Sequence, residues 1–582
     1  MRKSAWLASG WLLLTITANA YVLYLNGSGT PRRWNLSNPQ SSGINTNSVN
    51  PNTHAIRYYL AADGYSAGNV SAELNALRAS IGQWLSISNT SLKFEEAGLA
   101  SAPVDINLND HTNVIYWTKS STLVNGGTYD IGGATGVTFL SWNGNNVLLE
   151  ADLVLNGKTY SWFTDVTDTA NTGNLVEGVA LHELGHFLGI THTPVAGATM
   201  VFLGPAGANN LQARLSADDI AGIRFLYGQD ATNSGAITGT VTKNGSPVLG
   251  AQVFIQDAAS NLVAGVMSLS SGSYTAGMLP PGTYQVRAAP LAVNASARLV
   301  AAPDIDASFN SADLAFLPTA NISVVVTANA TNTVNLAVSN RTPAFRITHI
   351  RAPTSSSGSY AYFVPAVPVK MTVGQSNYYV GVGAASFPTA NASLTITGDG
   401  LTLGNSTFAN QNGINFVSAS ISISSNATPG LRSFIVTQYG TNVAYANGYL
   451  EIQPATMDWN FDGVNDLYQR QYFPIFTATN AGPNADPDGD GVNNYAESIA
   501  GTIPTNAGSH LKMRSVAWTN KAATIRWDSV NGKRYQMTYR TNLDDGSWQN
   551  VGSPVTAGGT NTLYSDTGAS NAMRVYRVQP LP

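Results

Sequence analysis

Residues 182–192, with the sequence His-Glu-Leu-Gly-His-Phe-Leu-Gly-Ile-Thr-His, constrain this chain more than any other stretch. The chain has seven histidines, and three of them lie in this one segment. His182 and His186 are one helical turn apart, so on a helix they lie on the same face and can bind one ion. Gly189 can adopt a positive φ that ends the helix and turns the chain back, which brings His192 into reach as a third ligand. Three histidine ligands leave a fourth position open, which is the arrangement of a catalytic zinc site rather than a structural one.

Glu183 follows the first of these histidines and lies beside the same helical face. From there its carboxylate can reach a water molecule at the open position of the ion. We therefore predict that Glu183 is the general base, and then the general acid, of a hydrolytic reaction. The alternative is that His182 and His186 are ordinary helix histidines, which leaves the adjacent Glu183, Gly189 and His192 unexplained.

The segment resembles the long zinc-binding motif of the metzincin metallopeptidases, His-Glu-x-x-His-x-x-Gly-x-x-His. That family also places a methionine in a tight turn under the zinc, and Met200, eight residues after His192, fits this position. The resemblance is greatest to the matrixins, whose domain ends in a segment similar to Asp218-Asp219-Ile220 to Leu226-Tyr227-Gly228. It covers residues 54–228 and implies an α/β (α+β) metzincin fold, a zinc cofactor and the cleavage of a protein or peptide substrate. Thr193 is a departure, because matrixins usually have serine there.

The composition limits the classes of protein to which the chain can belong. With 582 residues the chain is too long for one core, and we expect several domains. Charged residues make up only 11% of the chain and the net charge is −4, so nothing points to a nucleic-acid partner. The chain has no cysteine, which excludes disulfides, thiolate zinc ligands and the cysteine latch of the matrixin propeptide.

The N-terminal residues predict export from the cell. Arg2 and Lys3 precede an apolar run from Ala5 to Ile16, and small residues follow at 18–20. This pattern is typical of a secretory signal peptide, residues 1–20, and predicts a secreted, extracellular protein with no membrane span after signal removal. An N-terminal membrane anchor is the alternative, although the apolar core is short for a span. The lack of cysteine favours a bacterial protein.

The remaining chain divides into segments of different pattern. Residues 21–53 are a polar N-terminal extension, and residues 54–228 show the strand and helix order of a mixed α/β domain with four or five strands. In that domain we expect a helix from Val70 to Leu85, short strands at 92–94 and 106–108, and helix N-caps at Asn174 and Ser216.

The rest of the chain is predicted to form β modules. Residues 235–298 resemble a carboxypeptidase regulatory-like β-sandwich. One of the features that carry this resemblance is the turn segment Leu279-Pro280-Pro281-Gly282-Thr283-Tyr284. Residues 299–340 are a linker or complete that sandwich. Residues 341–455 are expected to form an immunoglobulin-like sandwich, and residues 510–582 a C-terminal one. Such modules offer contact with extracellular matrix or glycans.

An acidic segment, residues 456–509, separates the last two sandwiches and predicts calcium binding. Its second half matches the calcium loop D-x-D-x-D-G-x5-E, with Gly491 at the sharp turn. The predicted ligands are Asp486, Asp488, Asp490, the backbone carbonyl of Val492, and Glu497. A second loop has a poorer last position, Gln469, and its predicted ligands are Asp458, Asn460, Asp462 and Asp466. The pair resembles thrombospondin type-three or dockerin-like repeats, and a solvated acidic linker is the alternative.

The sequence therefore predicts a secreted zinc endopeptidase with accessory β modules. The competing interpretation is a catalytically silent adhesion protein that binds matrix or carbohydrate through those modules. Retention of Glu183 and of all three motif histidines favours the enzyme.

Overall fold

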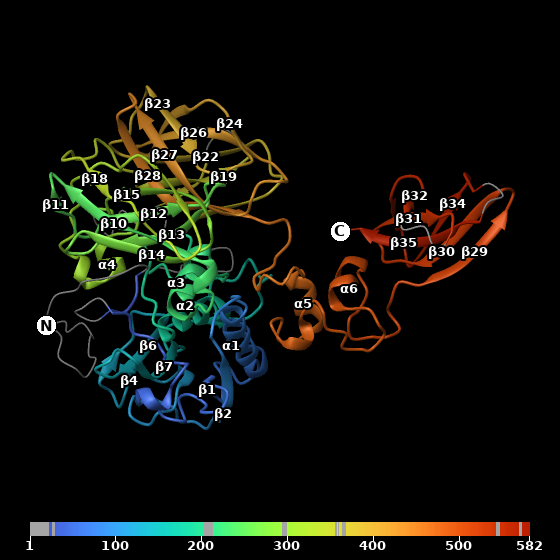
Figure 1. Cartoon of the computed structure of the whole chain (residues 1–582), viewed down its shortest axis with the longest axis horizontal. Coiled ribbons are helices and arrows are strands. Elements are labelled where there is room, and N and C mark those ends of the chain that lie inside the picture. Colours follow the sequence, from blue (N-terminus) through green and yellow to red (C-terminus); the bar gives the residue numbers. More distant parts are fainter. Residues whose placement is uncertain are drawn as a thin grey trace. The chain divides into compact units, whose positions relative to one another are not determined.

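The computed structural model describes residues 22–25, 30–202, 213–293, 299–355, 358, 360–363, 368–542, 547–569 and 573–581 (Figure 1). The predicted signal peptide lies outside these residues. The chain divides into two compact units, Met1–Ala455 and Thr456–Pro582. Within the described part of the chain, we find no helix with the length and apolar character that crossing a membrane requires.

The first part of the larger unit is a five-stranded sheet with two helices packed together on it. The strands run in the order β2-β1-β3-β7-β6, and all pairs are parallel except β6 with β7. The bounds are β1 Ile56–Ala61, β2 Phe94–Ala100, β3 Val114–Thr118, β6 Gly136–Trp142, β7 Leu148–Asn156, α1 Val70–Leu85, α2 Val176–Phe187 and α3 Ala217–Tyr227, with the short pairs β4 Leu123–Val124, β5 Tyr129–Asp130, β8 Trp162–Phe163 and β9 Asn174–Leu175. Helix α1 packs against α2 through the apolar residues that recur at helical spacing in its sequence. Trp84, near the end of α1, donates its indole N–H to the carbonyl of Leu181 in α2, at 3.0 Å.

Three local expectations differ from the structure. Residues 106–108 form no strand, and β2 begins at Phe94, where the expected strand ends. Asn174 is not the N-cap of α2, because it lies in β9 and the helix begins at Val176. Asn174 pairs with Trp162 of β8 and its side-chain amide donates to the Ser161 carbonyl at 3.4 Å, and Leu175 takes the cap position instead. Ser216 does cap α3, in a reciprocal pair with Asp219.

The N-terminal extension is built into this domain, although its sequence is polar. Trp34 is 1% exposed, stacks on Phe187 with ring centroids 5.9 Å apart, and donates to the Phe187 carbonyl. Leu23 forms an antiparallel bridge with Ile190, at the end of the histidine helix. The core of the α/β domain therefore includes side chains from before residue 54.

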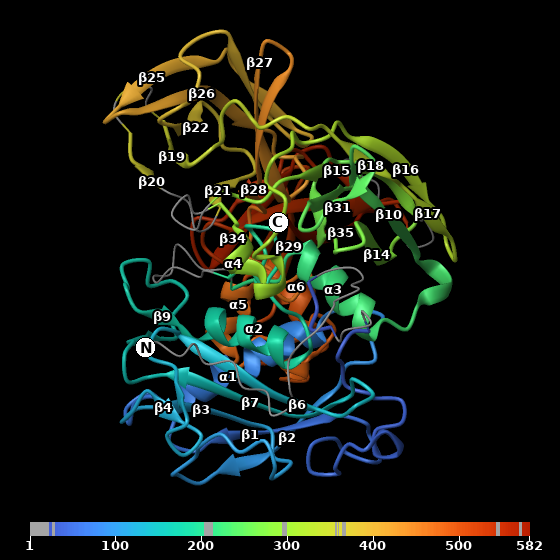
Figure 2. The same ribbon diagram turned by 90° about the vertical axis from the view of Figure 1, so that its left-hand side faces the viewer.

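Two β-sandwiches complete the larger unit (Figure 2). The first has sheets β11-β10-β14, with β17 and β18 also on β10, and β13-β12-β15-β16. The second has sheets β20-β19-β22-β26-β24, with β25 on β26, and β21-β28-β27-β23. The bounds are β10 Gly235–Lys243, β11 Ser246–Pro247, β12 Gln252–Gln256, β13 Leu262–Met267, β14 Ser273–Leu279, β15 Gly282–Ala289, α4 Ala302–Ile305, β16 Ile322–Val326, β17 Thr331–Thr333, β18 Leu336–Val338, β19 His349–Thr354, β20 Tyr362–Phe363, β21 Val369–Thr372, β22 Tyr378–Ala384, β23 Ala392–Ile396, β24 Leu401–Leu403, β25 Thr407–Gln411, β26 Ile414–Ile423, β27 Gly430–Gln438 and β28 Asn442–Gln453. Strands from residues 299–340 thus pair within the first sandwich.

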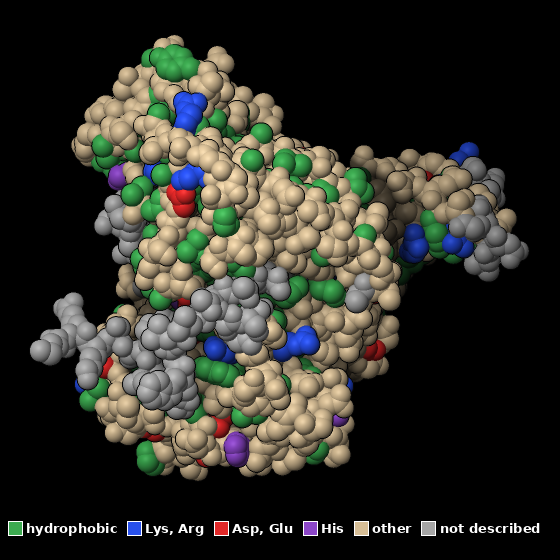
Figure 3. Space-filling view, turned by 60° about the vertical axis from the view of Figure 1, so that its left-hand side comes forward, with side chains coloured by type: hydrophobic (Ala, Val, Ile, Leu, Met, Phe, Trp, Pro, Cys, Tyr) green, Lys and Arg blue, Asp and Glu red, His purple; other side chains and the backbone are tan. Residues whose placement is uncertain are grey.

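The smaller unit holds two short helices and a third sandwich. Its sheets run β29-β30-β34 and β32-β31-β33, with β35 also paired to β31. The bounds are α5 Asp466–Tyr472, α6 Asn494–Ala500, β29 Met513–Thr519, β30 Ala522–Asp528, β31 Arg534–Arg540, β32 Gln549–Asn550, β33 Val555–Thr556, β34 Asn561–Asp566 and β35 Val575–Leu581. On the face of the molecule in Figure 3, described acidic and basic side chains are few and scattered, which agrees with the low charge of the sequence.

A buried carboxyl group in β7 predicts how stability changes with pH. Burial, then proximity to Asp110 and Asp152, raises the pKa of Glu150 from its usual 4.5 to about 8. The folded state therefore keeps a proton that the unfolded state loses, so stability present below pH 4.5 is lost as the pH rises to about 8. Glu150→Gln supplies a permanent N–H towards Asp110. We expect the wild-type free energy of unfolding to fall by up to about 1.4 kcal/mol per pH unit in this window, and the variant to fall less steeply. Denaturant titrations of both proteins at pH 5 and pH 8.5 measure this change. An equal change in the free energy of unfolding for wild type and variant would contradict the prediction.

Candidate metal centres

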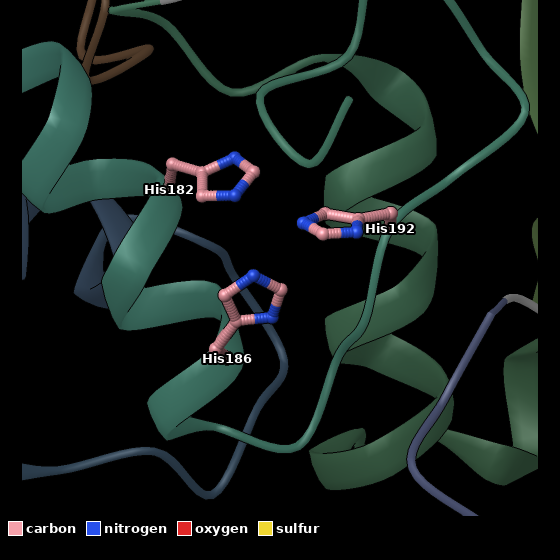
Figure 4. Close-up of side chains that lie close together, drawn as sticks. All are labelled: His182, His186 and His192. Atoms are coloured by element: carbon pink, nitrogen blue, oxygen red, sulfur yellow. The ribbon is translucent and has the colours of Figure 1, made fainter. Parts of the chain in front are cut away.

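The three motif histidines meet at one point, as the sequence predicts. His182 and His186 project from α2, and His192 approaches from the extended segment that follows (Figure 4). The ring centroids are 4.8 Å apart for His182 and His186, 5.3 Å for His182 and His192, and 4.9 Å for His186 and His192. One ring nitrogen from each lies within 4.8 Å of the others. Gly189 has φ of +100°, and this left-handed turn returns the chain to the helix.

Backbone carbonyls fix the orientation of two of the three rings. His182 Nδ1 lies 2.7 Å from the Thr199 carbonyl oxygen, and His186 Nδ1 lies 2.8 Å from that of Ile190. A proton held on Nδ1 leaves Nε2 of His182 and His186 as a free lone pair.

Burial also sets the charge state of the cluster. It lowers the pKa of all three histidines, that of His186 to about 3 and that of His192 well below its usual value. The rings are thus neutral at physiological pH, which a metal ligand requires. Three neutral imidazoles, two of them oriented by a hydrogen bond to a carbonyl, fit a zinc ion.

Glu183 lies beside the cluster, against the edge strand β6. Its carboxylate accepts a hydrogen bond from the Thr138 hydroxyl at 2.9 Å, and burial raises its pKa to about 7. Gly136 in β6 leaves the space for this side chain, because a Cβ at that position lies 2.8 Å from Glu183 Cγ. Strand β6 therefore holds the Glu183 side chain in place. This strand was not predicted from the sequence.

Met200 lies fully buried beneath α2, in the turn expected for it. A Cβ on Gly185 would lie 2.1 Å from Met200 Sδ, so the helix and the methionine pack without space between them. Asp219 holds the turn by accepting from the backbone N–H groups of Thr199 at 2.9 Å and Met200 at 3.1 Å. From the sequence, Asp219 was expected only as part of the segment that resembles the end of a matrixin domain, and its role in the turn was not predicted.

Comparison with known proteins agrees with this geometry. The family described as Matrixin matches residues 51–228, and the carboxypeptidase regulatory-like domain matches residues 236–307. Residues 51–228 are a matrixin-like metzincin domain. The multidomain architecture, with an α/β matrixin domain followed by β modules, is likewise confirmed.

Two curated relatives match parts of the chain. The hatching enzyme of Paracentrotus lividus is 39% identical over 118 residues, which cover 20% of this chain and 19% of that protein. Metalloendoproteinase 5-MMP of Arabidopsis thaliana is 36% identical over 83 residues, which cover 14% of this chain and 21% of that protein. The chain thus spans about a fifth of the length of these relatives. Among solved structures, the minor pilin GBS52 of Streptococcus agalactiae covers 19% of this chain and 45% of its own, with 12% identity and a TM-score of 0.14, too low to bear on fold or function.

The two acidic loops of the smaller unit have the same internal structure. In the second loop, the N–H groups of Gly491 and Val492 donate to Asp486 Oδ2 and Asp490 Oδ1. In the first loop, 28 residues earlier, the equivalent donors Gly463 and Val464 reach Asp458 Oδ2 and Asp462 Oδ1. Gly463 and Gly491 both have positive φ, of 84° and 90°. The weaker loop of the sequence is therefore a structural copy of the stronger one.

Side-chain oxygens without hydrogen-bond partners lie buried at matching positions of both loops. Asp466 Oδ1 and Gln469 Oε1 on α5 have their counterparts in Asn494 Oδ1 and Glu497 Oε2 on α6, and all four residues are 0% exposed. Buried acceptors without donors are costly, and a cation satisfies them. The sequence did not identify Asn494 as a ligand, although its position matches that of Asp466. The oxygens of Asp486, Asp488 and Asp490 lie within 4.8 Å of one another.

Proposed function

We propose that this chain is a secreted zinc-dependent endopeptidase that hydrolyses peptide bonds of extracellular proteins. The observation that carries the proposal is the convergence of three neutral, oriented imidazoles beside a buried carboxylate, Glu183. The matrixin match and the metalloproteinase relatives support a peptidase. Secretion rests on the basic and apolar N-terminal residues alone.

His182, His186 and His192 would hold the ion. The chemistry that zinc supplies when bound is polarisation of a carbonyl oxygen and acidification of a water molecule. Glu183 is held by Thr138 in a buried environment that raises its pKa to about 7, so the carboxylate takes a proton readily and returns it. We assign to it the removal of the proton from the attacking water and its delivery to the leaving amine. Met200 shapes the floor of the site and does not react.

Casein cleavage with and without metal tests this function. We expect the purified protein to contain about one zinc per chain at the histidine site and to cleave casein. Chelation of the zinc should abolish cleavage, and added Zn²⁺ should restore it. Cleavage that survives complete removal of zinc would overturn the proposal, as would a zinc-loaded protein that cleaves no protein substrate.

We further propose that both acidic loops bind Ca²⁺. The support comes from the shared loop geometry and from the unpartnered buried oxygens of α5 and α6. The ligands are those predicted from sequence, with Asn494 and Gln469 added. The amide of Gln469 donates to Asp462 at 2.7 Å, so the first loop offers fewer anionic oxygens and should bind more weakly.

Contact with matrix or glycans through the β modules remains a proposal from the sequence. Binding of the zinc-depleted full chain to a glycan array tests this proposal. The alternative of a catalytically silent adhesion protein is not favoured, because the site retains Glu183 and all three histidines.

A further inference from the structure

We propose that the N-terminal extension is a positioning element of the zinc centre, because its residues 22–24 hold Ile190, whose carbonyl orients His186. The inference rests on the proposed zinc site. It assigns to that site a segment that precedes the residues matched by the matrixin family. A segment that positions a metal ligand has to stay attached in the active enzyme. The extension is therefore not a propeptide whose removal activates the chain.

The start of the extension pairs with the turn that joins the second and third histidines. The N–H of Tyr24 donates to the carbonyl of Gly189 at 3.2 Å. In the opposite direction, the N–H of Thr191 donates to the carbonyl of Val22 at 2.8 Å. The two bonds form an antiparallel bridge at Ile190. The extension thus holds the peptide units on both sides of Ile190.

One of these peptide units orients the second ligand. The carbonyl of Ile190 and the N–H of Thr191 belong to the same planar unit and point in opposite directions. Because the carbonyl of Val22 fixes the N–H, the Ile190 carbonyl is aimed at His186 Nδ1, which lies 2.8 Å from it. Such an acceptor fixes the tautomer and the orientation of a ligating imidazole. The extension therefore acts on His186 through a single peptide unit.

Further along, the extension closes the carbonyl end of the histidine helix. The last carbonyls of an α-helix have no partner within the helix. The indole N–H of Trp34 donates to the carbonyl of Phe187 at 2.9 Å. A Cβ on Gly189 would lie 2.4 Å from the carbonyl oxygen of Arg32, so only glycine lets the extension approach the turn this closely.

Apolar burial anchors the extension. Leu23 and Trp34 are 4% and 1% exposed and belong to the main core of the matrixin domain. Val22 packs in a second buried cluster with Val201, the residue after Met200. Removal of the extension would expose this apolar surface to water and leave the carbonyl of Phe187 without its donor.

The side chain of Tyr24 shows which side of the ligand the extension contacts. Its hydroxyl lies 3.5 Å from His186 Nδ1, the ring nitrogen that faces the Ile190 carbonyl. With the proton on Nδ1, Nε2 is the nitrogen that remains for the ion. A segment that blocks the site has to reach the Nε2 side. The contact at Nδ1 is that of a support.

The zinc affinity of two variants at one position tests the proposal in the full chain. Tyr24→Pro removes the side chain and also the N–H that donates to Gly189, whereas Tyr24→Ala removes the side chain alone. We expect Tyr24→Pro to bind zinc about 10-fold more weakly than Tyr24→Ala in competition with a chromophoric chelator. Equal zinc affinity of the two folded variants would overturn the proposal.

Limited proteolysis of the wild-type protein tests whether the extension is removable. A product that has lost residues 1–34, identified by its mass, should bind zinc at least about 10-fold more weakly than the intact chain. Full zinc affinity in that product would overturn the proposal, because the site would then not need the extension.

Hydrogen exchange provides a third measurement, which needs neither a variant nor a cut. Binding of zinc should slow amide exchange in residues 22–34 as well as in residues 182–201, while exchange in β10 stays unchanged. A slowing confined to residues 182–201 would overturn the proposal. None of these measurements depends on peptide cleavage, so a protein that binds zinc as described and cleaves nothing would refute the proposed function alone.

Discussion

Replacing Glu183 by glutamine is expected to lower kcat/KM for peptide cleavage by about 10²-fold to 10⁴-fold, the usual contribution of a general acid–base group. Glutamine has the same size and can still accept from the Thr138 hydroxyl, so the fit against β6 is kept. It cannot take a proton from water. The rings of His182 and His186 are held by backbone carbonyls and not by Glu183, so zinc content should remain about one per chain. Steady-state kinetics on a fluorogenic peptide, with metal analysis of the same samples, measures both quantities.

Glu73→Gln is the matched control for that experiment. Glu73 is a buried carboxylate in α1 that accepts from the N–H of Tyr65 at 2.7 Å and has no contact with the histidine cluster. Its replacement should lower stability while kcat/KM changes by no more than a few-fold. Full activity of zinc-loaded Glu183→Gln would show that another group moves the proton, and zinc loss in that variant would show that Glu183 supports the metal rather than the reaction.

Removal of calcium is expected to disorder residues 456–509. In the absence of a cation, each buried oxygen without a partner on α5 and α6 carries a penalty of about 1–3 kcal/mol, and the clustered aspartates repel one another. Calcium at 100 times its dissociation constant stabilises the folded loops by about 2.7 kcal/mol per site. We therefore expect amide exchange in α5 and α6 to be much faster in the calcium-free, zinc-loaded chain than in the calcium-loaded chain, with the matrixin domain protected in both. Exchange in α5 and α6 that does not respond to calcium would contradict this expectation.

Variants of single loops separate the two calcium sites. Glu497→Gln should weaken the second loop, and Asp458→Asn the first, in calorimetric titrations of the calcium-free chain. Asp528→Asn removes a carboxylate that is ion-paired with Arg514 in the third sandwich, so it serves as the control and should change neither site. The wild type should show one tighter and one weaker site, because the side-chain ligands of the second loop include four carboxylates and those of the first loop three. A titration that detects no calcium binding would reduce both loops to an acidic linker.

Much of the zinc site was predictable because its information is local. The spacing of His182 and His186 needs only a helix, and Gly189 needs only a left-handed turn. The periodicity of α1 and the capping of α3 by Ser216 are local in the same sense. The duplication of the acidic loops was also predictable from the order of aspartates and glycines. In the first loop, the buried Gln469 Oε1 without a hydrogen-bond partner could not be predicted, because it depends on the position of α5 in the folded chain.

The features that were predicted wrongly, or not at all, share one physical cause, because each depends on contacts between segments that are distant in the sequence. Asn174 has the residue type of an N-cap, but its pairing with β8 decides its conformation. The polar extension before residue 54 gave no hint that Trp34 would stack on Phe187, since a single aromatic residue has no periodicity. The edge strand β6 shows no clear alternation of apolar and polar residues, so the strand was not predicted from the sequence. Its contacts with Glu183 through Gly136 and Thr138 could therefore not be predicted either.

The sequence by itself predicted the three histidine ligands, the general base and the resemblance to matrixins, because these depend on residue type and short spacing. Only the tertiary structure decided what orients the ligands. His182 has the same identity whether its Nδ1 faces water or the Thr199 carbonyl, and no pattern in the sequence relates residues 182 and 199. The 193–201 loop is buried between two sandwiches, and its packing places these residues together, because burial of apolar surface acts between elements that only the folded chain brings into contact.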